Sequence, residues 1–163
     1  MSIINFSKAN CKNCYRCVRE CPVKAIRVKD EQAEIVEELC IACGNCLRVC
    51  PQNAKEVKSE LDIIKGWISK GEKIAVSLAP SFSAVFKGKE WNSIVAGLKK
   101  LGISYVEETS EAARVISSGY QKYYNDSAKM LNITTCCPSV NYMIQKYYPS
   151  LIKYMIQMVS PVS

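Results

Sequence analysis

Ten cysteines and the absence of histidine define the chemistry open to this chain of 163 residues. Eight of the cysteines form two runs with the spacing Cys-x-x-Cys-x-x-Cys-x-x-x-Cys-Pro, offset by 29 residues. The first run comprises Cys11, Cys14, Cys17 and Cys21, and the second comprises Cys40, Cys43, Cys46 and Cys50. In a reducing compartment such clusters indicate metal sites rather than disulfides. Without histidine, a histidine-ligated zinc site and histidine-based acid–base catalysis are excluded.

The spacing of the two runs favours 4Fe–4S clusters. Two-residue gaps let three thiolates face one cubane, and in two-cluster ferredoxins the last cysteine of each run ligates the other cluster. This rule predicts one cluster on Cys11, Cys14, Cys17 and Cys50, and one on Cys40, Cys43, Cys46 and Cys21. The alternative is two four-cysteine zinc sites, which usually pair Cys-x-x-Cys knuckles across a longer gap. A third closely spaced cysteine is unexpected there, so we predict two electron-carrying 4Fe–4S clusters.

The elements that must position these cysteines form a small domain. Residues 25–29 and 33–36 alternate apolar and polar side chains, which predicts a hairpin. The core of such a domain is too small to stand alone, so the clusters would act as its staples. Residues 8–55 resemble bacterial two-cluster ferredoxins, with Ala42 where that family often has glycine. We expect an α+β ferredoxin-like two-cluster domain over residues 1–56.

A different pattern follows the cysteine runs. Apolar residues at helical spacing, from Val57 to Ile68, predict a linking helix over residues 57–72. Three short apolar runs predict strands, the first of them buried: 73–79, 103–106 and 131–135. Helical patterns follow each run, beginning near Trp91, near Ser110 and after Pro138. This order predicts a partial α/β parallel-sheet domain over residues 73–163. Because three strands make a thin sheet, we expect the domain to be incomplete.

The two remaining cysteines, Cys136 and Cys137, are expected at the end of the third strand. Pro138 suits the first position of a helix, which would place Cys137 at the helix cap. Ligands of open α/β sheets bind beyond the carboxyl ends of strands. Both features favour a metal or redox role, and the alternative is a pair of buried, inert thiols.

Thr135-Cys136-Cys137-Pro138 is similar to the first active-site motif of iron-only (FeFe) hydrogenases. Three further segments match that family in the same order: Leu78-Ala79-Pro80-Ser81, Glu108-Thr109-Ser110-Glu111-Ala112-Ala113 and Val159-Ser160-Pro161. The resemblance implies that Cys137 ligates the 4Fe–4S part of the H-cluster and that Cys136 relays protons near its diiron site. Ser139-Val140 replaces the Gly-Trp of briskly catalytic members and looks more like the sensory branch.

The number of cysteines limits what the chain can do alone. The H-cluster cubane needs four cysteines, and only Cys136 and Cys137 remain, so catalysis by this chain itself is uncertain. We predict an iron–sulfur electron-transfer protein, the N-terminal part of an FeFe-hydrogenase-like protein. One alternative is a stand-alone ferredoxin-type carrier whose α/β part docks a redox partner. Another is a thiol redox sensor, which the strain of a vicinal disulfide disfavours.

Charge and hydropathy disfavour nucleic acid and a membrane as partners of the chain. The formal net charge of +7 falls to about +3 once two clusters and their thiolates are counted. Lysines and arginines are also dispersed, which disfavours a nucleic-acid partner. No apolar run reaches the roughly 20 residues of a membrane helix, and the start lacks the apolar core of a signal peptide. We expect a cytoplasmic protein that exchanges electrons with redox proteins or with a downstream catalytic domain.

Overall fold

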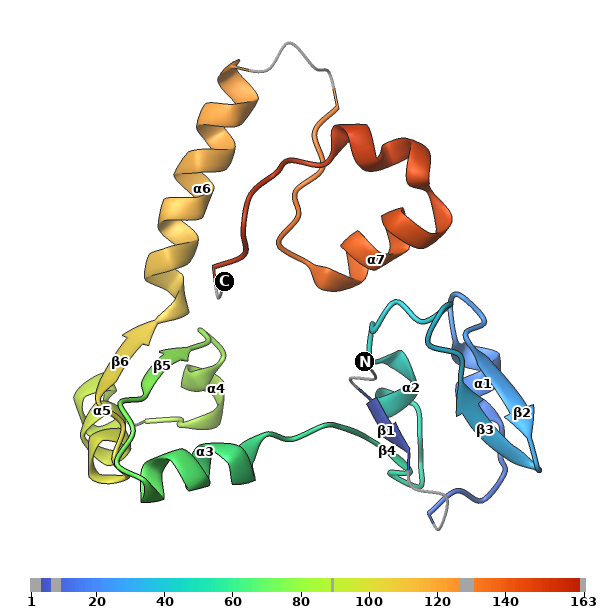
Figure 1. Cartoon of the computed structure of the whole chain (residues 1–163), viewed down its shortest axis with the longest axis horizontal. Coiled ribbons are helices and arrows are strands. Elements are labelled where there is room, and N and C mark those ends of the chain that lie inside the picture. Colours follow the sequence, from blue (N-terminus) through green and yellow to red (C-terminus); the bar gives the residue numbers. More distant parts are fainter. Residues whose placement is uncertain (1–3, 7–9, 89, 127–130, 162–163) are drawn as a thin grey trace. The chain divides into compact units, whose positions relative to one another are not determined.

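The computed structural model describes residues 4–6, 10–88, 90–126 and 131–161 (Figure 1). The chain divides into two compact units. The first comprises Met1–Ser59 and Cys137–Lys153, and the second comprises Glu60–Cys136 and Tyr154–Ser163. A late segment of the chain thus belongs to the same unit as both cysteine runs.

The two cysteine runs adopt the same backbone conformation. Each contains a short helix, α1 (Arg16–Glu20) in the first run and α2 (Asn45–Arg48) in the second. Positive φ angles recur at three pairs of equivalent positions: Asn13 and Ala42, Tyr15 and Gly44, and Lys24 and Asn53. Residues other than glycine seldom adopt positive φ, so the recurrence reflects the sequence repeat. It also explains a glycine preference at the position of Ala42, whose φ is 54°.

The first unit contains two antiparallel strand pairs. β2 (Ile26–Lys29) and β3 (Gln32–Ile35) form the predicted hairpin, whose two turn residues both have positive φ, as in a type I′ turn. β1 (Ile4–Phe6) pairs with β4 (Lys55–Val57), a pairing that was not predicted. The placement of Val57 on a helix is wrong, because it lies in β4 opposite Ile4.

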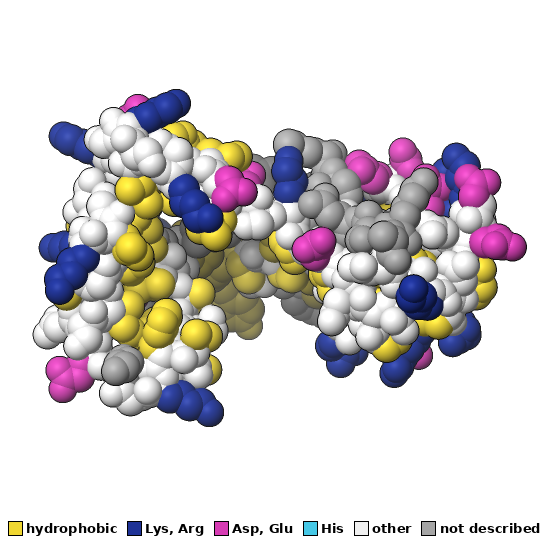
Figure 2. Space-filling model, turned by 90° about the horizontal axis from the view of Figure 1, so that it is seen from below, with side chains coloured by type: hydrophobic (Ala, Val, Ile, Leu, Met, Phe, Trp, Pro, Cys, Tyr) yellow, Lys and Arg dark blue, Asp and Glu magenta, His cyan; other side chains and the backbone are white. Residues whose placement is uncertain are grey.

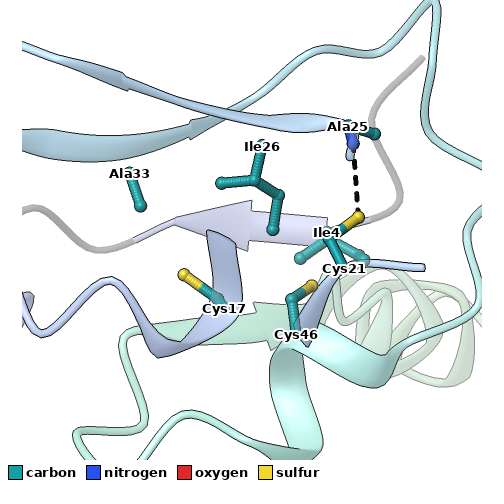
Figure 3. Close-up of a cluster of buried hydrophobic side chains, with 7 residues drawn as sticks. All are labelled: Ile4, Cys17, Cys21, Ala25, Ile26, Ala33 and Cys46. Atoms are coloured by element: carbon teal, nitrogen blue, oxygen red, sulfur yellow. Dashed lines mark hydrogen bonds between the residues drawn. The ribbon is translucent and has the colours of Figure 1, made fainter. Parts of the chain in front are cut away.

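The buried core of the first unit is built partly from thiols (Figure 3). Its members are Ile4, Cys17, Cys21, Ala25, Ile26, Ala33 and Cys46. Because three of these seven residues are cysteines, apolar packing by itself gives this unit little stability. Whatever binds the thiols therefore contributes to holding the fold together.

The second unit is built around one parallel strand pair. Its elements are α3 (Leu61–Ser69), β5 (Ala75–Leu78), α4 (Phe82–Val85), α5 (Trp91–Lys100), β6 (Tyr105–Glu108) and α6 (Thr109–Asp126). β5 and β6 run parallel, from Ala75 opposite Tyr105 to Leu78 opposite Glu108. The crossover between them contains α5, which confirms the predicted strand–helix–strand order.

Two strand predictions need correction. The segment 131–135 forms no strand, since Ile133 makes an isolated bridge to Met155. The backbone of Ile133 bonds with Tyr154 and Ile156, at 2.8 and 2.9 Å, and not with β5 or β6. The expectation that β5 is buried is also wrong, because its side chains alternate between exposed and half-buried positions. Such alternation is typical of a strand with one covered face.

The second unit leaves apolar side chains exposed. Figure 2 shows hydrophobic side chains gathered on one face over the part of the chain with α3, β5 and α5. Leu61, Trp67 and Leu101 have exposed fractions of 55%, 48% and 65%. Apolar side chains gathered on an exposed face often mark a contact with another protein. Among the described helices, none has the length and apolar character needed to cross a membrane.

The predicted helix after Pro138 is α7 (Pro138–Tyr147), which belongs to the first unit. The expected helical continuation near Leu151 is a 3₁₀ helix, η1 (Pro149–Tyr154). The Pro138 ring occupies the first helical position, where a missing N–H costs nothing.

Candidate metal centre

Two hollows in the first unit are each lined by four cysteines. The first is lined by Cys11, Cys14, Cys17 and Cys50. The second is lined by Cys21, Cys40, Cys43 and Cys46. Each hollow thus takes three cysteines from one run and the last cysteine from the other. The structure brings together the same two sets of four that the sequence analysis groups.

Backbone N–H groups point at sulfur atoms in both runs. The N–H of Ala25 donates to Cys21 Sγ at 3.3 Å (Figure 3), and the equivalent N–H of Ala54 donates to Cys50 Sγ at 3.4 Å. The N–H of Ala42 donates to Cys40 Sγ at 3.4 Å. Such donors stabilise negative charge on sulfur, and loops with positive φ concentrate them around an anion. The loops therefore suit anionic iron–sulfur cores with thiolate ligands.

The pKa values of two cluster-run thiols, Cys46 and Cys50, are shifted in opposite directions. Burial raises the pKa of Cys46 to about 11, and the charge of Lys55 opposes that rise. At Cys50 burial also acts to raise the pKa, but N–H donors from Ala54 and Gln52, with the charge of Lys55, outweigh it and lower the pKa. A metal ligand must be a thiolate, so binding at Cys46 has to displace a proton.

Among the described residues, the cysteine side chains form no preassembled site for a single metal ion. All ten cysteines are free thiols. Within the described residues, no three cysteine or acidic side chains converge closely enough to hold one metal ion.

Cys136 and Cys137 are both exposed, which rules out the alternative of a buried pair. Cys137 is the N-cap residue of α7, as predicted. The segment before Cys136 is fixed by Thr135, whose hydroxyl lies 2.8 and 2.9 Å from the carbonyl oxygens of Ile156 and Met158. Thr135 and Pro138 flank the cysteine pair in the sequence, and Cys136 belongs to the second unit whereas Cys137 belongs to the first.

Two other segments quoted for the hydrogenase resemblance meet at one sheet edge. Leu78 is paired with Glu108 at the carboxyl ends of β5 and β6. The hydroxyls of Ser77 and Thr109 lie 2.8 Å apart across the same pair. In parallel sheets this edge is the usual location of functional groups.

Comparison with known proteins decides the family. Residues 72–163, more than half of the chain, match the model described as iron only hydrogenase large subunit, C-terminal domain. The chain belongs to the iron-only hydrogenase family. Residues 3–58 match the model described as a 4Fe-4S dicluster domain. No curated protein matches the chain.

This hydrogenase-family chain is an iron–sulfur protein with an electron-transfer role, as its two matched segments together require. The resemblance drawn from the Thr-Cys-Cys-Pro motif and the two cysteine runs is confirmed. The mixed helix and strand content and the small parallel sheet are confirmed as well.

Two features of the hydrogenase-family chain were missed by sequence reasoning. Lys146 and Tyr147 of α7 donate hydrogen bonds to the turn before the second cysteine run. Their acceptors are backbone carbonyls about a hundred residues away, so no motif encodes the contact. The second feature is the buried Lys55, whose Nζ lies 3.3 Å from Cys17 Sγ. Comparison of the two repeats could have found Lys55, because it stands where the first repeat has the apolar residue Ile26.

Proposed function

We propose that residues 1–56 form a ferredoxin-like domain that binds two 4Fe–4S clusters and relays electrons between them. The first cluster takes Cys11, Cys14, Cys17 and Cys50, and the second takes Cys21, Cys40, Cys43 and Cys46. The observation that carries this proposal is the exchange of the fourth cysteine between the two hollows. The exchange ties both repeats to both cubanes and keeps the cubanes within one small unit.

The rest of the chain supplies the acceptor side of this relay. In the proposal residues 57–72 are a linker, and residues 73–163 form part of an α/β hydrogenase domain. Cys137 serves as a ligand of the H-cluster cubane, and Cys136 relays protons beside the diiron site. Their exposure and the cap position of Cys137 support these roles. Two cysteines are half of what the cubane needs, so other protein has to supply the remaining ligands.

The proposal also sets the surroundings in which the chain acts. Cysteines that serve as metal ligands suit a reducing compartment, and we place the protein in the cytoplasm. There a soluble redox protein would donate electrons to the clusters, and a hydrogenase catalytic centre would exchange them with protons and hydrogen.

Anaerobic reconstitution tests the metal assignment. About eight irons and eight sulfides per chain, with spin-coupled 4Fe–4S signals in the EPR spectrum after reduction with dithionite, are the expected result. Two zinc ions per chain and no EPR signal would contradict it. The control is the same treatment of a protein with all eight cysteines of the two runs changed to serine, which should retain neither metal.

A hydrogen assay tests the cysteine count. The reconstituted chain should neither take up nor evolve hydrogen, because Cys136 and Cys137 cannot complete the cubane of an H-cluster. Turnover that persists after removal of loosely bound iron would show that the missing ligands can be replaced from within the chain.

A further inference from the structure

One buried cation breaks the symmetry between the two cysteine runs. Lys55 is the counterpart of Ile26, since the runs are offset by 29 residues. Both side chains are buried, with exposed fractions of 5% for Lys55 and 6% for Ile26. The preceding alanines, Ala54 and Ala25, are both 1% exposed. The packing is therefore matched at the two positions, and the difference is one positive charge.

The charge lies at the first hollow. Lys55 lines that hollow, whereas Ile26 lines the second. The Nζ atom of Lys55 donates a hydrogen bond to Cys17 Sγ at 3.3 Å. Its charge also reaches Cys46 of the second hollow, where it opposes the effect of burial on the thiol. The direct contact, however, is with a cysteine of the first hollow.

We propose that Lys55 raises the reduction potential of the first cluster above that of the second. The inference rests on the proposed pair of 4Fe–4S clusters. Reduction adds one electron from an external low-potential donor to a cubane, lowers the charge of its core by one unit and moves no proton. A fixed positive charge beside a ligand sulfur stabilises the added electron. Ile26 offers the second cluster no such charge, so the first electron to enter the unit resides on the first cluster.

Exposed cations near the hollows have a weaker effect. Lys12 also lines the first hollow, and Lys146 bonds to the backbone of Cys40, but both side chains are exposed. Water and salt screen such charges over a Debye length of about 10 Å at 0.1 M ionic strength. The charge of a buried lysine acts through protein of much lower dielectric constant. Among the described residues that line the two hollows, Lys55 is the buried cation.

The Lys55→Met variant removes the charge and keeps most of the apolar stem. Redox titration of the reconstituted full chain, followed by the hyperfine-shifted NMR signals of the cysteine β-protons, assigns each reduction to one cluster. We expect the equilibrium constant for reduction of the first cluster to fall at least tenfold, which is about 59 mV for a one-electron couple. The constant for the second cluster should fall less. Lys55→Arg retains the charge and should retain the potential.

Lys29→Met is the matched control, because Lys29 is an exposed lysine in β2 of the same unit. It should change both constants less than twofold. A Lys55→Met shift no larger than that of Lys29→Met would overturn the role of Lys55. If Lys55→Met does not retain its clusters, Lys55→Gln removes the charge but keeps a hydrogen-bond donor, and the same comparison applies. Iron far below about eight per chain in the unaltered protein would instead contradict the two-cluster proposal itself.

Discussion

The Nζ atom of Lys146 donates a hydrogen bond of 2.6 Å to the carbonyl oxygen of Cys40. The same atom lies 2.9 Å from the carbonyl oxygen of Glu37, and the hydroxyl of Tyr147 donates to Leu39 at 2.7 Å. The helix that begins after Cys137 is thus fastened by its last turn to the turn that leads into the second cysteine run. Cys137 and the second cysteine run are distant in the sequence and belong to the same unit.

Tyr147→Phe should weaken this attachment. The change deletes the hydroxyl that donates to Leu39 and also lies 3.5 Å from the carbonyl oxygen of Val23. It leaves the ring in place, so the cost should be about 0.5–1.5 kcal/mol. Hydrogen exchange of the Cys40 amide, which donates to the carbonyl of Val36 at 3.0 Å, should become correspondingly faster. Tyr148→Phe is the control, because Tyr148 is 53% exposed and its loss of a hydroxyl should leave exchange unchanged. Equal effects of the two variants would contradict the assigned contact.

Paired cysteine substitutions should test the exchange of ligands between the runs. Cys14→Ser with Cys50→Ser removes two cysteines of one hollow. If that hollow holds one cluster, the double variant should keep the other, with about four irons per chain and an uncoupled EPR signal.

The matched control for that experiment places both changes in one run. Cys14→Ser with Cys21→Ser removes one cysteine from each hollow, and iron should fall well below that of the first double variant. The reverse order of iron contents would mean that each run binds its own cluster.

Removal of the clusters should unfold the first unit in preference to the second. Three of the seven residues in its buried core cluster are cysteines, so bare thiols leave that cluster too small to offset the entropy of folding. After chelation of iron, amides of β2 and β3 should lose protection in hydrogen-exchange mass spectrometry. Those of β5 and β6 should change little, since no cysteine of either run lies in the second unit. Retained protection in β2 and β3 would show that the clusters are not structural.

Gly102→Ala should destabilise the second unit more than Gly71→Ala. Both glycines have positive φ, 100° and 71°, but a Cβ at Gly102 would lie 3.1 Å from Cγ2 of Ile68, whereas at Gly71 nothing lies within 4 Å. Strain from φ alone costs about 1–3 kcal/mol, and the contact adds to it at Gly102. Trp67 and Trp91, the two tryptophans of the chain, both lie in this unit, so denaturation followed by tryptophan fluorescence reports on it directly. Equal denaturation midpoints for the two variants would mean that the Ile68 side chain moves aside without an energetic cost.

Elements with strong local patterns were predictable. The hairpin at β2 and β3 follows from alternation around a two-residue turn, and α5 and α7 follow from apolar spacing and from Pro138. The grouping of the cysteines around two hollows follows the spacing of the repeat, and their role as cluster ligands stays a prediction. The prediction of a third strand over residues 131–135 was wrong, because the backbone partners of Ile133 are set by tertiary structure. The exposure of β5 also depends on neighbours that its own apolar run does not specify.

The division of the first unit into Met1–Ser59 and Cys137–Lys153 has a consequence for biosynthesis. A ribosome adds about 5–20 residues per second, so the second cysteine run is synthesised about 4–18 s before α7 begins at Pro138. During that interval the carbonyl groups of Glu37 and Cys40 have no α7 amine to bind. The proteins that deliver iron and sulfide can therefore reach the newly made cysteine runs before α7 binds the turn that contains Glu37 and Cys40.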